Sequence, residues 1–505
     1  MKLKLTTLLT LLLSVHLSAQ QFMNPVIPGD FADPTVIRVG DKYYAAGTSS
    51  EWAPHYPIFE SVDLVNWNYV GPAFQTAPEW TKASFWAPEL YVLNGKIYMY
   101  YSARRASDGV SYIGVATTDD IRKGFDDHGC MVEFGSEAID AFIFEDEGKL
   151  YISWKAYGLD PRPIELLCSE ISPDGLKLVG EPFMLLKDDD DAGLEGQYMY
   201  KKGDYYYIIY SIRSCCGAGS DYAVSVARSK SFRGPYEKYE GNPILEGDGN
   251  DILSCGHGTA VEVPDGRMFY LFHAYMKGNG FYNGRQGLLK ELAINDEKWP
   301  YFVTGKHPLV NEPMPFANTK QVGISDFEDR FEGNKIRPEW TWNFTFSDIR
   351  TKVENKTLML TGTSKADNKY GTTLCLRTFR PDYEIYTEVK DQEGIFSGLT
   401  LYGDKDNLII FGKEKGELVL KQVRKGEEQV LFREQVQGNI CLKIVVSDGS
   451  NASYYKSTTP GSFQSVSQNH DVSFLPPWDR GFRPGLIHIG DENIPAEFTY
   501  CNLKY

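Results

Sequence analysis

Residues 195–210 read EGQYMYKKGDYYYIIY, and four other stretches of the chain repeat this pattern. Each copy is a short apolar run, a tight turn that contains glycine, and a second run rich in tyrosine or phenylalanine, which is typical of a β-hairpin. The other copies are residues 33–44 (DPTVIRVGDKYY), 88–101 (PELYVLNGKIYMYY), 140–154 (DAFIFEDEGKLYISW) and 257–272 (HGTAVEVPDGRMFYLF). The turn glycines are Gly40, Gly95, Gly148, Gly203 and Gly266, at steps of 55, 53, 55 and 63 residues. Repetition at this period, in strands without a helical pattern, predicts an all-β fold with a five-bladed β-propeller.

Four of the five copies place an ionisable side chain at nearly the same position. Asp33, Asp140, Glu195 and His257 lie 7 to 9 residues before the turn glycine of their copy. In a propeller this position is the start of the innermost strand of each blade. We therefore expect these four side chains to face one central cavity.

The repeats end near Val310, and the rest of the chain has a different pattern. Residues 311–325 have the proline and asparagine content of a linker. Short apolar runs then alternate with Gly, Asp and Asn turns, which favours a β-sandwich. Because 505 residues are too many for one ordinary core, we expect two domains, a propeller over residues 22–310 and a sandwich over 326–505.

The N-terminus has the pattern of a secretory signal peptide. Residues 1–20 read MKLKLTTLLTLLLSVHLSAQ, with a basic start, an apolar stretch and small residues at Ser18 and Ala19. The expected cleavage point has no cysteine, which argues against a lipoprotein anchor. No later apolar run is long enough to span a bilayer. We expect an exported protein, periplasmic or extracellular, with no membrane span.

The formal net charge of −16 argues against nucleic acid and other polyanions as partners. A neutral polysaccharide or oligosaccharide substrate fits this charge better. Eight cysteines permit disulfides in an exported chain, but their pairing cannot be derived from the sequence.

Three carboxylates in one cavity suit the hydrolysis of a glycosidic bond. This reaction needs one acid that protonates the leaving oxygen and one ionised carboxylate that activates water or attacks the sugar. A third carboxylate raises the pKa of the acid, because like charges confined together cannot all ionise. A single aspartate at a strand start would be a turn cap or a surface group, whereas three at one position of separate repeats favour catalysis. This chemistry requires no cofactor.

Five segments resemble the successive signatures of glycoside hydrolase family 43, over residues 24–310. They are residues 31–37 (FADPTVI), 85–91 (FWAPELY), 139–151 (IDAFIFEDEGKLY), 194–211 (LEGQYMYKKGDYYYIIYS) and 256–263 (GHGTAVEV). The resemblance implies a five-bladed propeller that cleaves arabinose- or xylose-containing glycans with inversion at the anomeric carbon.

The resemblance also implies a role for each carboxylate. Asp33 is the expected general base, Glu195 the general acid, and Asp140 the residue that tunes the pKa of the acid. An inverting arrangement predicts that the carboxyl groups of Asp33 and Glu195 lie about 6.5–9.5 Å apart. Ala141 and Gln197 occupy two positions where the family usually has proline.

His257 has two interpretations. A histidine at the start of a buried strand is ordinarily a core residue. The family resemblance instead places it near a cation, commonly calcium, on the propeller axis. One histidine is a poor calcium ligand on its own, because this cation prefers oxygen.

Aromatic residues and one arginine are candidates for the walls of the sugar pocket. Trp86 and Trp52 are candidate stacking platforms, whereas Trp154, in a tyrosine-rich strand, is better explained as a core residue. Arg285 matches an arginine of the fifth blade that reaches into the pocket of the family, where its fork of donors could hold a sugar hydroxyl and a carboxylate. The alternative for Arg285 is a surface salt bridge.

The adjacent cysteines Cys215 and Cys216 resemble versions of this segment in several branches of the family. They could line the rim of the pocket, or one of them could bridge to Cys255.

The C-terminal part resembles the concanavalin-like sandwich that follows the propeller in one branch of the family. The resemblance rests on residues 326–343, 397–412 and 496–505. In that branch a loop of the sandwich can help to close the pocket, which favours removal of single terminal sugars.

Together these patterns favour an exported, inverting exo-glycosidase that releases β-D-xylose or α-L-arabinofuranose, with a β-xylosidase preferred because of the sandwich. An endo-arabinanase and a catalytically silent carbohydrate-binding propeller are the alternatives. Retaining fructosyl hydrolases share three axial carboxylates but begin with a different nucleophile signature.

Overall fold

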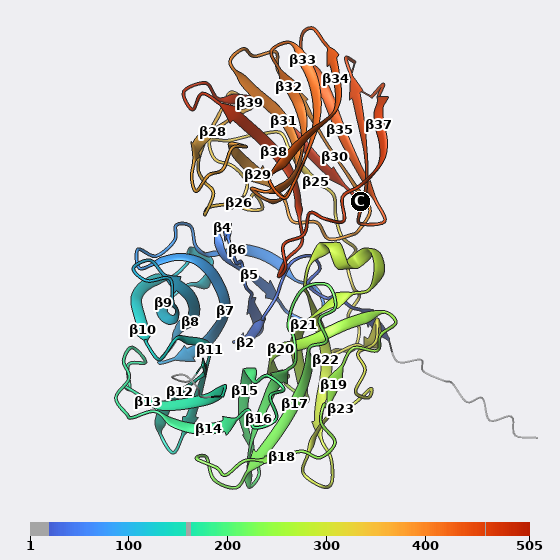
Figure 1. Ribbon diagram of the computed structural model, residues 1–505. Helices are drawn as coiled ribbons and strands as arrows, with labels where there is room; N and C mark the ends of the chain where they lie inside the picture. The colour runs from blue at the N-terminus through green and yellow to red at the C-terminus, as the bar shows by residue number, and fades with distance from the viewer. Residues whose placement is uncertain (1–19, 158–162, 460) are drawn as a thin grey trace, which may run out of the picture.

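The computed structural model describes residues 20–157, 163–459 and 461–505. It consists of an N-terminal β-domain and a C-terminal β-domain stacked on it, drawn below and above in Figure 1. The signal peptide predicted over residues 1–20 falls almost entirely outside the described residues. Within the described part of the chain, no helix is long and apolar enough to cross a membrane.

The N-terminal domain is built from five antiparallel sheets that follow one another along the chain. Blade 1 contains β2 (Thr35–Val39), β3 (Lys42–Ala46), β5 (His55–Ser61) and β6 (Asn68–Phe74). Blade 2 contains β7 (Thr81–Leu93), β8 (Lys96–Arg105), β9 (Ser111–Thr118) and β10 (Asp126–Val132). Blade 3 contains β11 (Glu137–Asp146), β12 (Lys149–Tyr157), β13 (Glu165–Ile171) and β14 (Phe183–Lys187). Blade 4 contains β15 (Glu195–Lys202), β16 (Tyr205–Ile212), β17 (Ala223–Ser229), β18 (Glu237–Lys238) and β19 (Leu245–Glu246). Blade 5 contains β20 (Ile252–Glu262), β21 (Met268–Met276), β22 (Gln286–Ile294) and β23 (Pro300–Phe302).

The first strands of the five blades form a closed ring around the axis. Strands β2, β7, β11, β15 and β20 contact one another in this order, and β20 returns to β2. At this closure the backbone N–H of Val36 donates to Thr259 Oγ1 at 2.8 Å. Each repeated hairpin of the sequence forms the first two strands of one blade, so the propeller prediction is confirmed.

The N-terminal segment closes the propeller from outside. Strand β1 (Gln21–Met23) pairs with β24 (Asn311–Pro313), which lies in the stretch expected to be a linker. Asn24 Nδ2 donates to the carbonyl oxygens of Leu289 and Leu309, at 3.1 and 3.2 Å. These contacts tie the two ends of the propeller domain together.

The C-terminal domain is a β-sandwich. One six-stranded sheet contains β25 (Phe327–Asp329), β40 (Cys501–Lys504), β30 (Tyr383–Val389), β35 (Ile440–Ser447), β36 (Asn451–Ser457) and β37 (Gln464–Asp471). The other contains β29 (Thr372–Cys375), β38 (Arg483–Gly490), β31 (Ile395–Asp404), β32 (Asn407–Glu414), β33 (Glu417–Arg424) and β34 (Glu427–Gln435). A small third sheet contains β27 (Ser347–Glu354), β28 (Thr357–Ser364) and β39 (Ala496–Phe498). Buried residues from all three sheets, such as Leu360, Leu399 and Ile444, form one apolar core, as two packed sheets require.

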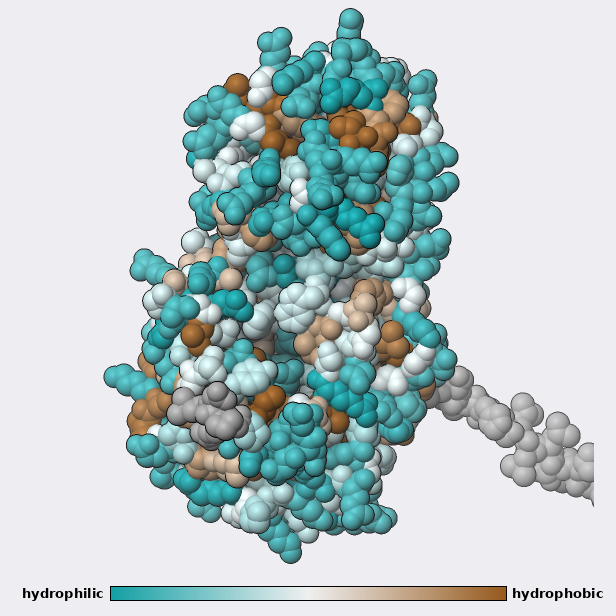
Figure 2. Space-filling view, viewed as in Figure 1, coloured by the Kyte–Doolittle hydropathy of each residue, from teal (hydrophilic) through white to brown (hydrophobic). Residues whose placement is uncertain are grey.

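The two domains are joined by a strand pair and by buried charges. Strand β4 (Trp52–Ala53) of the propeller pairs with β26 (Trp342–Asn343) of the sandwich. Arg483 Nη2 donates to Asp30 Oδ2 at 3.3 Å across the same boundary. The visible face of the molecule is mostly hydrophilic, with apolar side chains in scattered groups (Figure 2).

Candidate active site

In each blade one residue within or just before the innermost strand lies in the left-handed backbone region. The φ angles are 50° at Asp33, 43° at Ala87, 59° at Asp140, 59° at Gly196 and 38° at His257. In blades 2 to 5 the hairpin register shifts at this point, which indicates a β-bulge that redirects side chains next to a site.

In blade 4 the left-handed residue is not the one that the alignment by turn glycines predicts. Gly196, and not Glu195, takes the left-handed conformation. A Cβ on Gly196 would lie 2.7 Å from Cγ of His257, so only glycine fits there. Glu195 precedes it and reaches the cavity from the first residue of β15.

Asp33 is buried among fixed hydrogen-bond partners. Its Oδ1 accepts from Arg285 Nη1 at 3.0 Å and its Oδ2 from Thr48 Oγ1 at 2.6 Å. Burial raises the pKa of Asp33, but the Arg285 guanidinium together with His273 and His257 outweighs burial and holds the pKa well below its usual value. Asp33 is therefore ionised at any ordinary pH and can accept a proton.

His273 supports Asp33 from β21. The backbone N–H of Asp33 donates to His273 Nδ1 at 3.1 Å. Burial lowers the pKa of His273 to about 4, so the ring is neutral and its Nδ1 is free to accept.

Asp140, on β11 of blade 3, contacts the start of β15 in blade 4. Its Oδ2 accepts the backbone N–H of Gly196 at 3.0 Å, and its own N–H donates to Ser102 Oγ at 3.0 Å. Gln197 Nε2 donates to the carbonyl oxygen of Asp140 and to Ser153 Oγ. Gln197, where the family usually has proline, thus links these two blades.

Glu195 is bound by a lysine and a tyrosine. Its Oε2 lies 2.8 Å from Lys155 Nζ on β12, and its Oε1 accepts from Tyr222 OH at 2.9 Å. Burial raises the pKa of Glu195, but the Lys155 ammonium and these two hydrogen bonds bring the pKa below its usual value. Burial raises the pKa of Asp140 to about 6, and the charges of Glu195 and Asp33 act in the same direction. Of this carboxyl pair, Asp140 therefore has the higher pKa and Glu195 the lower.

His257 lies between two of the three carboxylates, Asp33 and Asp140. Its Nδ1 lies 3.6 Å from Asp33 Oδ1 and 3.8 Å from Asp140 Oδ2. The imidazole is therefore part of the pocket wall. Of the two expectations for this residue, burial in the core is wrong, because its side chain keeps 14% of its accessible surface.

The carboxylate oxygens near His257 do not fit the oxygen cage that calcium requires. Asp33 is occupied by Arg285 and Thr48, and Asp140 Oδ2 by the backbone of Gly196. No group of three or more His, Cys, Asp or Glu that could hold a metal ion occurs in the described parts of the chain. We therefore derive no step through a cation.

A loop of the sandwich reaches the pocket and holds Arg285. The guanidinium Nε donates to the carbonyl oxygen of Asp479 at 3.3 Å. The side chain of Asp479 accepts from Ser50 Oγ at 2.7 Å and from Arg480 Nη1 at 2.5 Å. Arg285 is 3% exposed, so the alternative of a surface salt bridge is wrong.

The three tryptophans have different positions. Trp86 is half-buried midway along β7, one residue before Ala87, whose N–H donates to Thr48 Oγ1. Trp154 is fully buried in the core, as expected. Trp52 corrects the prediction of a sugar platform, because it is 1% exposed and packs against Tyr402 and Arg483 of the sandwich. It lines a cavity of about 240 Å³ between the domains, not the axial pocket.

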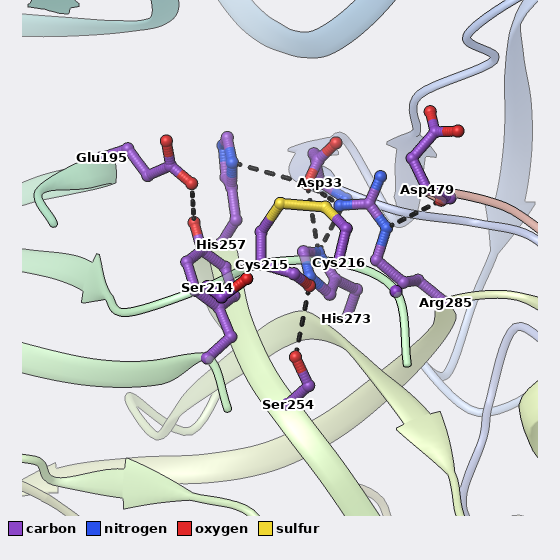
Figure 3. Close-up of a disulfide and its surroundings, with 12 residues drawn as sticks. Asp33, Glu195, Ser214, Cys215, Cys216, Ser254, His257, His273, Arg285 and Asp479 are labelled. Carbon is purple, nitrogen blue, oxygen red and sulfur yellow. Dashed lines mark hydrogen bonds and ion pairs between the residues drawn. A yellow bond between two sulfur atoms is a disulfide. The ribbon is translucent and has the colours of Figure 1, made fainter. Parts of the chain in front are cut away.

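Cys215 and Cys216 form a disulfide with each other. Cys255 is buried and free, so the bridge considered between it and one of these cysteines is wrong. Figure 3 shows the disulfide among Glu195, Asp33 and Arg285.

Among the contacting residues that the sequence reasoning missed are Thr48, Lys155, Tyr222 and Asp479. Lys155 carries a signal that could have revealed it, since a charged residue stands between the apolar residues Trp154 and Ala156 in a mostly buried part of β12. The other three carry no such signal, because their contacts depend on chain segments far apart in the sequence.

Comparisons with known proteins agree with this architecture. Residues 22–300 match Glycosyl hydrolases family 43, and residues 328–486 match the Beta xylosidase C-terminal Concanavalin A-like domain. The chain is 30% identical over 324 residues to a Vibrio protein named xylan 1,3-beta-xylosidase, covering 58% of this chain and 59% of that protein. It is 28% identical over 374 residues to a Bacillus subtilis beta-xylosidase, covering 67% of this chain and 66% of that protein.

The match thus spans about three fifths to two thirds of the length of these relatives. The crystal structure of a family 43 protein from Bacillus licheniformis shares the fold, with a TM-score of 0.83, 22% identity, and coverage of 96% of this chain and 100% of that one.

Proposed function

The chain belongs to glycoside hydrolase family 43, and from this premise we propose that it releases single terminal pentoses from plant-type oligosaccharides or polysaccharides by inversion. We propose β-D-xylose as the preferred sugar and α-L-arabinofuranose as the second candidate. The proposal rests mainly on one observation, that Asp33 accepts a hydrogen bond from Arg285 and shares His257 as a neighbour with Asp140, the partner of Glu195. One pocket therefore holds a proton acceptor and a proton donor.

The roles follow from these environments. Asp33 removes a proton from the water that attacks the anomeric carbon, while Glu195 gives a proton to the leaving oxygen as the glycosidic bond breaks. A sugar in the pocket excludes water from Glu195, which favours its protonated form. The proton shared with Asp140 is then available at Glu195.

Release of single sugars is supported by the sandwich. A Cβ on Gly481 would lie 2.7 Å from the carbonyl oxygen of Tyr282, so the sandwich loop packs tightly on the propeller. The loop covers one side of the pocket next to Arg285. A closed side favours a chain end over an internal bond, and this distinguishes the proposal from an endo-arabinanase.

The N-terminal pattern of residues 1–20 supports the further proposal that the protein is exported. The names of the two relatives support xylosides as substrates.

A substrate panel tests the proposed function. Aryl β-D-xyloside, aryl α-L-arabinofuranoside, xylobiose and linear arabinan are each incubated with the purified protein, and released sugars are separated by chromatography. The proposal expects free xylose from the xylosides with no oligosaccharide intermediates. Oligosaccharides from arabinan would support the endo-arabinanase, and no release from any substrate would support a silent binding propeller.

The pH profile of kcat/KM reports the proton of the Asp140–Glu195 pair. We expect activity to be constant from about pH 4 to about pH 6 and to fall tenfold per pH unit above that range. Above the pKa of about 6 for Asp140 the pair loses its proton, and no acid remains. The base Asp33 sets no limit in this range, because its pKa lies far below it.

Lys155→Met sharpens this test. Loss of the ammonium removes the charge that lowers the pKa of Glu195, so the alkaline fall moves to higher pH. A profile measured by initial rates with xylobiose checks both expectations. An unchanged alkaline fall in Lys155→Met would contradict the assignment of this fall to the pair.

A further inference from the structure

The disulfide between Cys215 and Cys216 lies in the loop that also supports the proposed acid. This loop connects β16 to β17 and spans residues 213–222. Its last residue, Tyr222, donates to Glu195 Oε1 at 2.9 Å. The disulfide therefore lies on the same connection as a direct partner of the group that protonates the leaving oxygen.

Two hydrogen bonds anchor the disulfide to blade 5. Ser254 Oγ donates to the carbonyl oxygen of Cys215 at 3.2 Å, and the N–H of Gly217 donates to Tyr275 OH at 3.1 Å. Ser254 is three residues before His257, and Tyr275 is two residues after His273. The same strands, β20 and β21, thus position the disulfide and the histidines beside Asp33. In the view of Figure 3 the sulfur atoms lie between Glu195 and Arg285.

A tryptophan of the sandwich adjoins this disulfide loop. A Cβ on Gly217 would lie 3.0 Å from the carbonyl oxygen of Trp478, so the two backbones touch. Trp478 directly precedes Asp479, which binds Arg285, yet it is 62% exposed. A large apolar side chain thus remains open to solvent at the edge of the pocket, while its neighbour is buried.

Stabilisation of the fold does not account for this disulfide. A bridge stabilises the fold mainly by lowering the entropy of the unfolded chain, an effect that grows with the logarithm of the length of the loop that it closes, and these cysteines are adjacent. What the bridge does provide is a compact, polarisable and apolar surface, because both cysteines are half-buried and uncharged. The C–H faces of a sugar pack well against such surfaces and against indoles.

We propose that the Cys215–Cys216 disulfide and Trp478 bind the sugar on the leaving-group side of the cleaved bond. These residues then determine how well the protein uses an oligosaccharide, whose leaving group is another pentose, relative to a substrate with a minimal leaving group. The inference rests on the proposed function, because it takes Glu195 as the marker of the leaving oxygen.

The test compares xylobiose with β-D-xylosyl fluoride, whose leaving group is a single atom. The variants are the double substitution Cys215→Ser with Cys216→Ser, and separately Trp478→Ala. For each variant we expect the ratio of kcat/KM for xylobiose to that for the fluoride to fall about tenfold, mostly through KM. Cys130→Ser is the matched control, since Cys130 is a half-buried free thiol on the outer strand β10, and it should leave the ratio unchanged.

Reduction provides a second test that needs no substitution. A phosphine and one water convert the bridge to two thiols; the water supplies the two thiol protons and the oxygen of the phosphine oxide that forms. The ratio in the wild-type protein should then fall as in the double variant. An unchanged ratio in the reduced protein and in Trp478→Ala would overturn the inference, whether the two substrates lose no activity or lose it equally. If the wild-type protein hydrolyses neither substrate, the proposed function itself is overturned, and this inference with it.

Discussion

Asp33→Asn is expected to lower kcat on every substrate by about 10³–10⁴-fold, the upper range for loss of a positioned base. The amide keeps the size of the side chain and can still accept from Thr48 or Arg285, but it cannot take a proton from water. Because water attack occurs whatever the leaving group, the loss should be similar for xylobiose and for an activated aryl xyloside. Steady-state rates with both substrates measure this effect.

The control for Asp33→Asn is Asp190→Asn. Asp190 forms a surface ion pair with Lys238 at 2.9 Å and its side chain is 71% exposed, so this change should leave kcat unaltered. Thermal unfolding of both variants separates loss of chemistry from loss of folding. An Asp33→Asn protein that is folded and retains more than about a tenth of wild-type kcat would remove Asp33 from the role of base.

Glu195→Gln is expected to show a loss that depends on the leaving group. With xylobiose, whose leaving alcohol needs a proton, kcat/KM should fall about 10²–10³-fold. With 2,4-dinitrophenyl β-D-xyloside, whose leaving group is stable as an anion, the fall should be about tenfold or less. The physical reason is that protonation matters only when the leaving oxygen is basic.

The control for this experiment is Glu237→Gln in the same blade. Glu237 pairs with Arg228 at 3.3 Å at the surface, where its side chain is 66% exposed. Equal losses of Glu195→Gln on the two substrates would indicate that Glu195 binds the sugar and does not act as its acid.

The propeller could be predicted because its signal is local and repeated. Each hairpin carries its own turn glycine and aromatic run, and five copies specify five blades. The axial position was predicted for Asp33, Asp140 and His257, and all three residues share the left-handed backbone conformation. In blade 4 the alignment matched Glu195 to the left-handed residues of the other blades, but the left-handed residue is the next one, Gly196, because only glycine fits there.

The parts of the site that were missed depend on contacts between distant segments. Asp479 holds Arg285 across nearly two hundred residues, and no local pattern encodes this contact. Trp52 was misassigned for the same reason, since the sandwich surface that buries it begins almost three hundred residues later. The cysteine pairing could not be derived because eight cysteines allow many pairings.

The electrostatics of the acid differ from the simple expectation for a trio of carboxylates. Three like charges alone would raise the pKa of Glu195, but the buried Lys155 reverses this effect and leaves the raised pKa on Asp140. Of the two neighbouring carboxyls, Asp140 therefore has the higher pKa.

Stereochemistry of the first product tests the central claim most directly. Hydrolysis of xylobiose or an aryl β-D-xyloside is followed by proton NMR at early times, before mutarotation mixes the anomers of xylose. Single displacement by water activated at Asp33 predicts that α-xylose appears first. If β-xylose appears first, the reaction proceeds with retention, and the assignment of Asp33 as a base opposite Glu195 is contradicted.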